Sequence, residues 1–187
     1  VYDVYMREGQ RELKSRGVEV PYEMTWLDGA LREDYTFAQL VACDFAFYSR
    51  LHIIKSILKE MKWKADGPAD EYYDGVMSST HNYLDLNDCV YRKGAISAHK
   101  GEDVIIPINM RDGVIIGTGK GNPDWNGSAP HGAGRILMRT EVANTHTVSE
   151  FKKEMEGIWT SCIGKDTLDE APFAYRRIDQ IQAALAY

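Results

Sequence analysis

The feature that most constrains this fold is an apolar stripe at helical spacing between Tyr35 and Trp63. Apolar residues that recur every three or four positions predict one face of an amphipathic helix. The stripe consists of Phe37, Leu40, Val41, Tyr48, Leu51, Ile54, Leu58 and Met61. The sequence therefore predicts one long helix here, which Gly67-Pro68 should end.

Shorter elements surround this helix. Residues 3–16 predict a helix that stops at Gly17, and residues 21–33 predict a loop. Short strands are predicted at residues 76–79, 89–91, 104–108 and 114–116. Three further helices should begin near Gly132, near Thr147 and between Ala174 and Ile178. The first should continue to about Val142, and Thr147 with Glu150 forms a capping box at the start of the second. The prediction is an α+β fold in a single domain, residues 1–187.

Composition narrows the class of protein. Hydrophobic residues make up 44% of the chain and charged residues 27%, which is ordinary for a soluble domain and argues against disorder. No apolar run reaches the roughly 20 residues of a membrane helix, so no membrane partner is expected. The three cysteines, Cys43, Cys89 and Cys162, are widely spaced and odd in number, which favours a reducing cytoplasm over a disulfide framework.

Net charge and the chain ends add two expectations. The formal net charge is −6, which fits a nucleic-acid binder poorly, although basic residues outnumber acidic ones between Val90 and Arg139. Chance scatter and a phosphate-binding face both explain that local excess. The chain begins with Val1 and ends in an amphipathic segment from Ile178 to Tyr187, so we expect a fragment of a longer protein.

The strongest chemical signal lies between Gly117 and Arg139. Residues 117–134 hold six glycines and two prolines, so the backbone there can approach a ligand closely. His131 precedes Gly132-Ala133-Gly134 at the predicted helix start, where free N–H groups suit a phosphate. On that helix, Arg135 and Arg139 would share the face of His131. The alternative is a helix start that needs small residues for packing, with solvated arginines.

Two weaker signals lie upstream. His81-Asn82 could supply a metal ligand and a hydrogen-bonding group, although one histidine cannot make a metal site, and from spacing alone a satisfied structural histidine is the more common explanation. Arg92-Lys93-Gly94-Ala95 could hold a phosphate, or could be a solvated strand end.

The order of these segments, taken together, resembles the C-terminal half of RtcB-type RNA ligases. The resemblance covers nearly the whole chain. Its most specific part is the His-Gly-Ala-Gly-Arg motif. The matching segments are Asp44 to Arg50, His81-Asn82, Arg92 to Ala95, Pro130 to Arg135 and Glu170 to Arg176.

This resemblance implies an activity and a set of roles. RtcB enzymes join an RNA 3′-phosphate, or a 2′,3′-cyclic phosphate, to a 5′-hydroxyl through a histidine–GMP intermediate, using GTP and a divalent metal, usually Mn²⁺. The match makes His131 the guanylylated nucleophile and His81 a metal ligand. Asn82, Asn109, Gly132, Ala133, Gly134 and Tyr175 would contact the nucleotide, with Tyr175 stacked on guanine. Lys93, Arg135 and Arg139 would contact nucleotide or RNA phosphates. The implied partners are GTP, RNA (tRNA halves or broken RNA) and a missing N-terminal region of the same protein.

Two departures from the family pattern bear on this interpretation. The family's Asp/Cys metal motif and two further metal-binding histidines belong to an N-terminal region and do not occur here, so the isolated chain is expected to be inactive. Many members also read Pro-Gly-Ser-Met-Gly where this chain has Pro107 to Arg111, with Asn109 replacing a serine. A divergent branch with another RNA target, such as RNA repair, fits that change. The alternatives to a ligase are a non-catalytic nucleotide- or RNA-binding module and a metal-dependent phosphohydrolase using His131 as acid or base.

Overall fold

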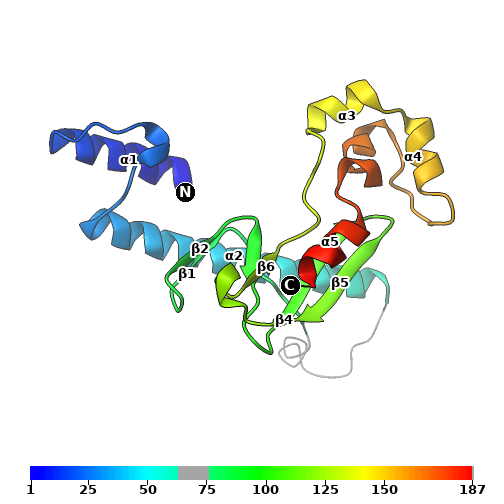
Figure 1. Ribbon diagram of the computed structural model, residues 1–187, viewed down its shortest axis with the longest axis horizontal. Helices are drawn as coiled ribbons and strands as arrows, with labels where there is room; N and C mark the ends of the chain where they lie inside the picture. Colours follow the sequence, from blue (N-terminus) through cyan, green and yellow to red (C-terminus); the bar gives the residue numbers. More distant parts are fainter. Residues whose placement is uncertain (63–75, 187) are drawn as a thin grey trace. The chain divides into compact units, whose positions relative to one another are not determined.

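A computed structural model of the chain describes residues 1–62 and 76–186. The predicted α+β class is confirmed, since helices and short antiparallel strands both occur (Figure 1). The chain forms two compact units, residues 1–76 with 83–89 and residues 77–82 with 90–187, and each is described separately. The predicted helix stop at Gly67-Pro68 lies outside the described residues.

The first unit is largely helical. It contains α1 (Tyr2–Ser15), the 3-10 helix η1 (Tyr22–Met24), α2 (Gly29–Glu60) and the short strand β1 (Tyr83–Asp85). Gly9 of α1 lies against the loop before α2, since a Cβ there would come within 2.5 Å of Leu27 Cδ2. Arg16, which follows α1, is joined to the end of the same loop by two hydrogen bonds to the Asp28 carboxylate, at 2.9 and 3.2 Å.

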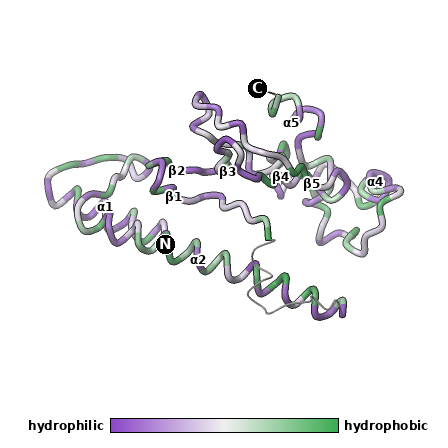
Figure 2. The backbone as a smooth tube through the Cα atoms, turned by 90° about the horizontal axis from the view of Figure 1, so that it is seen from below, coloured by the Kyte–Doolittle hydropathy of each residue, from purple (hydrophilic) through white to green (hydrophobic). Residues whose placement is uncertain are grey.

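The long helix is present, but it begins six residues before the predicted start at Tyr35. Asp28 is the N-cap and has extended backbone, and the last five residues of the predicted 21–33 loop belong to the helix. Of the predicted apolar stripe, Leu51 is buried, whereas Phe37 and Tyr48 are 69% and 66% exposed. Figure 2 shows hydrophobic and hydrophilic residues succeeding one another along α2. His52, near the middle of α2, is exposed.

The second unit contains two antiparallel strand pairs. Strand β2 (Val90–Arg92) leads into β3 (Ala95–Ser97), which pairs with β6 (Ser128–Pro130). Strand β4 (Asp103–Asn109) pairs with β5 (Gly113–Thr118), and a register shift lies between Pro107 and Asn109. The 3-10 helix η3 (Pro123–Trp125) lies between β5 and β6. The predicted strand at 76–79 is wrong, because no regular structure occurs there.

Two hydrophobic cores hold this unit together. The first joins β3 and β4 to helix α5 (Ile178–Leu185), which lies against the β4–β5 hairpin in Figure 1 and contributes Ile181 to the core. The second is built from α3 (Arg139–Thr145), α4 (Val148–Glu154) and the 3-10 helices η4 (Lys165–Glu170) and η5 (Pro172–Ala174). Its centre is Phe151, which is fully buried. The predicted capping box on α4 is present, with Thr147 and Glu150 each accepting from the other's backbone N–H.

The helix predicted from Gly132 to Val142 is wrong in its first half. Gly134 has φ +72°, and the N–H of Ile136 donates to the carbonyl of Ala174 at 2.8 Å. These backbone groups therefore pair with a distant segment and not with the preceding helical turn, so α3 begins only at Arg139. Among the described residues, no helix combines the length and apolar character that crossing a membrane requires.

Candidate active site

His131 directly follows β6 and is held beside the start of β3. The pairing of Ala95 with Pro130 brings Gly94 opposite His131, and the His131 N–H points at the Gly94 carbonyl at 3.4 Å. A Cβ on Gly94 would lie 3.8 and 3.9 Å from the imidazole Cδ2 and Nε2 atoms. Gly94 therefore leaves this edge of the ring open, and its φ of +69° favours glycine independently.

The predicted metal ligand and the predicted nucleophile lie together. The rings of His81 and His131 stack with centroids 5.0 Å apart and an interplanar angle of 28°. Asn82 fixes this arrangement, because its side-chain carbonyl accepts the N–H of Gly94 at 3.0 Å. Asn82 itself adopts φ +58°, a conformation that asparagine tolerates better than most residues. Two segments far apart in sequence thus meet at one half-buried imidazole.

The surroundings of His131 favour its neutral form. Burial lowers the pKa of the His131 imidazole, and the neighbouring His81 lowers it further, because a second positive charge nearby would be unfavourable. A neutral imidazole keeps a lone pair available for nucleophilic attack or metal ligation.

The segment after His131 rests on β4. The N–H of Ala133 donates to the carbonyl of Pro107 at 3.1 Å, and Ala133 is buried in the first core. A Cβ on Gly132 would lie 3.1 Å from the same carbonyl, so the backbone approaches closely there. Small side chains at this point have a packing role, whether or not they also line a nucleotide.

The guanidinium groups of Arg135 and Arg139, the two arginines predicted to bind phosphate, contact oxygen atoms of the protein itself. Arg135 donates from Nε to the Leu137 carbonyl, from Nη1 to Tyr175 and Glu170, and from Nη2 to the Asp169 carbonyl. Arg139 forms ion pairs with the carboxylates of Asp169 and Glu170. Every guanidinium nitrogen of Arg135 is therefore used, and the charge of Arg139 is balanced.

Tyr175 belongs to the same network. Its hydroxyl donates to Glu170 and accepts from Arg135 Nη1 at 3.0 Å, while the Arg135 guanidinium lies 5.0 Å from the ring centroid. Burial raises the pKa of the Tyr175 hydroxyl, and its hydrogen bond to Glu170 raises it further. The ring packs against both hydrophobic cores. These contacts give Tyr175 a structural role, and its stacking on guanine stays a prediction.

The neighbouring cations Arg92 and Lys93 face different surroundings. Arg92 is 2% exposed and donates to Ser128 Oγ at 3.1 Å and to the Asn126 carbonyl at 3.2 Å. It therefore ties β2 to the loop and strand that precede His131. Lys93 is exposed after β2 and remains the residue of this pair that solvent or a ligand can reach.

Asn109 closes the turn between β4 and β5. Its side-chain oxygen accepts the N–H groups of Arg111 and Asp112, at 3.0 and 2.9 Å, and its amide donates to the Asp112 carboxylate at 3.0 Å. Arg111 bonds the same carboxylate, holding the pKa of Asp112 below its usual range. Both polar atoms of Asn109 thus have partners in the turn, and its contact with a guanine base stays a prediction.

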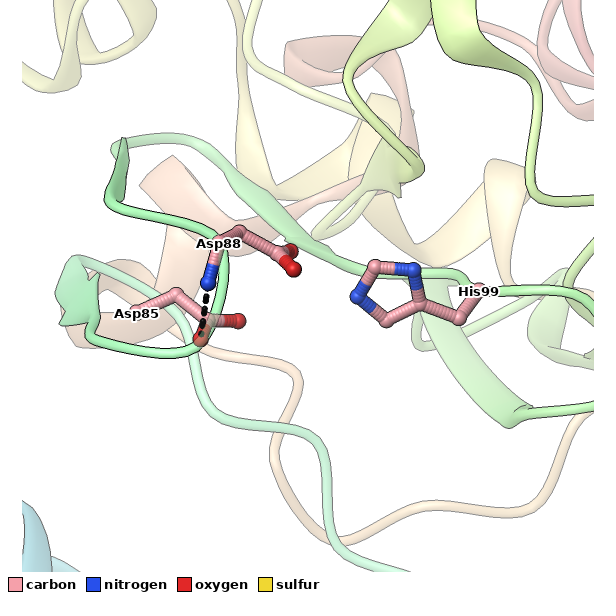
Figure 3. A group of neighbouring side chains, drawn as sticks. All are labelled: Asp85, Asp88 and His99. Carbon is pink, nitrogen blue, oxygen red and sulfur yellow. Dashed lines mark hydrogen bonds between the residues drawn. The ribbon is translucent and has the colours of Figure 1, made fainter.

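Among the residues that the structure describes, no complete metal site surrounds His81. In the first unit, Asp85 accepts the N–H of Asn87 at 3.0 Å and the N–H of Asp88 at 3.4 Å, which is a turn-forming arrangement. Figure 3 shows the bond from Asp88. His99, drawn in the same figure, belongs to the second unit. Within the described part of the second unit, no three His, Cys, Asp or Glu side chains converge. The donors present there do not fit a whole Mn²⁺ site, since such sites need several convergent ligands.

Sequence reasoning missed two features of this region. Arg176 lies directly over Gly134, with Nη1 2.5 Å from the position that a Cβ would take. Gly94 matters through the space that it leaves beside His131. Arg176 lies in the Glu170 to Arg176 segment that the sequence singled out, but only the backbone pairing shows which residue it faces.

Comparison with known proteins shows which protein family this chain is similar to. The family model described as tRNA-splicing ligase RtcB matches residues 1–186. A tRNA-splicing ligase RtcB from Pyrobaculum aerophilum is 27% identical over 214 aligned residues, covering 96% of this chain and 44% of that protein. The RNA-splicing ligase RtcB of Escherichia coli (strain K12) is 34% identical over 111 residues, covering 56% of this chain and 27% of that protein. A tRNA-splicing ligase RtcB from Nanoarchaeum equitans is 36% identical over 110 residues, covering 49% and 23%.

This chain spans less than half the length of these relatives. The match to the family nevertheless extends over almost every residue present. It includes the His-Gly-Ala-Gly-Arg motif and the His-Asn segment that the structure brings together. The chain therefore belongs to the RtcB family of tRNA-splicing ligases.

Proposed function

We propose that this chain is the guanylate-accepting part of an RNA ligase that joins a 3′-phosphate or 2′,3′-cyclic phosphate end to a 5′-hydroxyl end. The observation that carries the proposal is the stacking of His131 on His81, at 5.0 Å, in a family member. The relatives are named tRNA- or RNA-splicing ligases, which supports RNA as the substrate. The widely spaced free cysteines fit a cytoplasmic enzyme.

In this proposal His131 is the nucleophile. The neutral imidazole attacks the α-phosphorus of GTP, a nitrogen–phosphorus bond forms, and pyrophosphate leaves with the electrons of the broken phosphoanhydride bond. The ring, which carries a positive charge once the nitrogen–phosphorus bond has formed, then loses its one remaining N–H proton to solvent. Gly94 keeps the Nε2 edge clear, while the Asn82–Gly94 hydrogen bond holds the two histidines in place.

A divalent metal would offset phosphate charge when it is bound. His81 is the ligand that this chain would supply, and the remaining ligands would come from outside the described residues. We therefore expect the 187-residue chain alone to bind Mn²⁺ weakly and to form no GMP adduct.

The test is incubation of the full protein with α-labelled GTP and Mn²⁺. The proposal expects a covalent label that is stable to base and labile to acid. His131→Ala should abolish the label, and the matched control His52→Ala should keep it, because His52 is exposed on α2. Reversible GTP binding without an adduct would indicate a non-catalytic binding module. Release of phosphate without an adduct would indicate a phosphohydrolase.

A further inference from the structure

The residues after His131 run antiparallel to the segment after η5. The carbonyl of Gly134 accepts the N–H of Arg176 at 3.1 Å, and the carbonyl of Ala174 accepts the N–H of Ile136 at 2.8 Å. These two bonds flank a bridge between Arg135 and Tyr175, which lie directly opposite each other. Residues directly opposite each other in an antiparallel bridge share one face, and on this face Arg135 Nη1 donates to the Tyr175 hydroxyl at 3.0 Å.

The opposite face belongs to Gly134 and Arg176. Gly134 has no side chain, and the Arg176 guanidinium fills the space that one would occupy, with Nη1 2.5 Å from the Cβ position. The φ of +72° at Gly134 also disfavours any side chain there. The Arg176 cation is thus held against the backbone of the glycine motif, three residues beyond His131.

Charge distinguishes Arg176 from the two arginines of the motif. Arg135 and Arg139 are paired with Asp169 and Glu170 on the other face. Within residues 1–62 and 76–186, no carboxylate forms an ion pair with Arg176, and the residue is exposed. Its donors are therefore available to an anion, and a guanidinium binds phosphate through paired N–H groups.

We propose that Arg176, and not Arg135 or Arg139, is the arginine that binds a phosphate of the nucleotide at the Gly132–Gly134 segment. This inference rests on the proposed function, because that function makes the nucleotide react with His131. Arg135 and Arg139 then have a positioning role: their ion pairs with Asp169 and Glu170 fix the segment on which Arg176 and His131 meet the substrate.

The test compares Arg176→Ala with Arg177→Ala in the full protein. Arg177 is the matched control because it is an adjacent, exposed arginine whose Nε donates to Asp179 at 3.2 Å. Arg176→Ala should raise the KM for GTP in adduct formation about tenfold to a hundredfold, as for loss of a charged hydrogen bond. Arg176→Lys should recover part of this loss. Guanosine, which has no phosphate, should bind the wild type and both variants equally.

Each possible result of these measurements either supports or overturns the role proposed for Arg176. The inference is overturned if the KM for GTP is unchanged in Arg176→Ala, or if Arg177→Ala raises this KM equally. In either case, formation of the GMP adduct by the wild-type protein would still support the proposed function. Equal losses for GTP and guanosine would indicate a structural role and also overturn it. If binding of a 3′-phosphate RNA weakened and GTP binding did not, the phosphate would come from RNA and the nucleotide assignment would be wrong. Wild-type protein that binds GTP through Arg176 without forming an adduct would support this inference and refute the proposed nucleophile.

Discussion

Substitution of Gly134 by alanine separates two effects that the structure combines at this residue. A non-glycine residue at φ +72° costs about 1–2 kcal/mol of folding free energy. The new Cβ would also lie 2.5 Å from Arg176 Nη1, so the guanidinium must move roughly 1 Å to reach an ordinary separation of about 3.5 Å. Because Nη1 is the far end of a flexible side chain, this movement should add little to the loss of stability. The displacement of the Arg176 guanidinium should, however, raise the KM for GTP about tenfold, equivalent to about 1.4 kcal/mol of binding free energy.

The matched control is Gly157→Ala. Gly157 has φ +85°, and a Cβ there meets no atom within 4 Å, so it carries the backbone cost alone. Urea midpoints of the two variants should fall by similar amounts, and only Gly134→Ala should weaken GTP use in the labelling assay. Equal KM values for the two variants would refute the argument that the space over Gly134 matters to the ligand.

Three further predictions follow from other contacts. Arg92→Lys should lower the free energy of unfolding, measured in urea, by on the order of 2 kcal/mol. One ammonium group cannot replace a buried guanidinium that donates separately to Ser128 and Asn126. An unchanged urea midpoint would contradict this. Tyr175→Phe should lower the melting temperature through the lost hydrogen bond to Glu170 and leave GTP affinity unchanged; loss of affinity would refute stacking through the ring alone. Hydrogen bonds from Thr147 lower the pKa of Glu150, so the stability advantage over Glu150→Gln should be full above the unfolded-state pKa and should vanish as the pH falls through the folded-state pKa. A difference that stays undiminished on acidification would contradict this.

Local sequence signals predicted those elements whose determinants are local. Apolar spacing located α2, and the reciprocal pair Thr147 and Glu150 located the start of α4. The same reasoning failed for residues 132–138, because Gly134 and Ile136 take hydrogen-bond partners some forty residues further along the chain. Spacing within a short window cannot report such a pairing, and glycine is equally compatible with a helix start and with an extended segment.

The residues of the candidate site were likewise only partly predictable from the sequence. The resemblance to the family singled out His81 and His131, and the structure brings these residues together in one unit. It also singled out Asn109, whose amide atoms all have partners in a turn. A motif records which residue types recur, whereas the competing use of a polar side chain by its own backbone becomes visible only in the folded chain.

The arginines show how the secondary structure decides the chemistry. On a helix starting at Gly132, residues four apart would place Arg135 and Arg139 on the His131 face. In the isolated antiparallel bridge that forms instead, Arg135 lies opposite Tyr175 and donates to Tyr175 and Glu170, while Gly134 faces Arg176. The carboxylates of Asp169 and Glu170 then balance the motif's own cations. In our proposal, a phosphate that reacts at His131 is bound by Arg176, which would make the Tyr175-Arg176 segment as much a part of the site as the glycine motif.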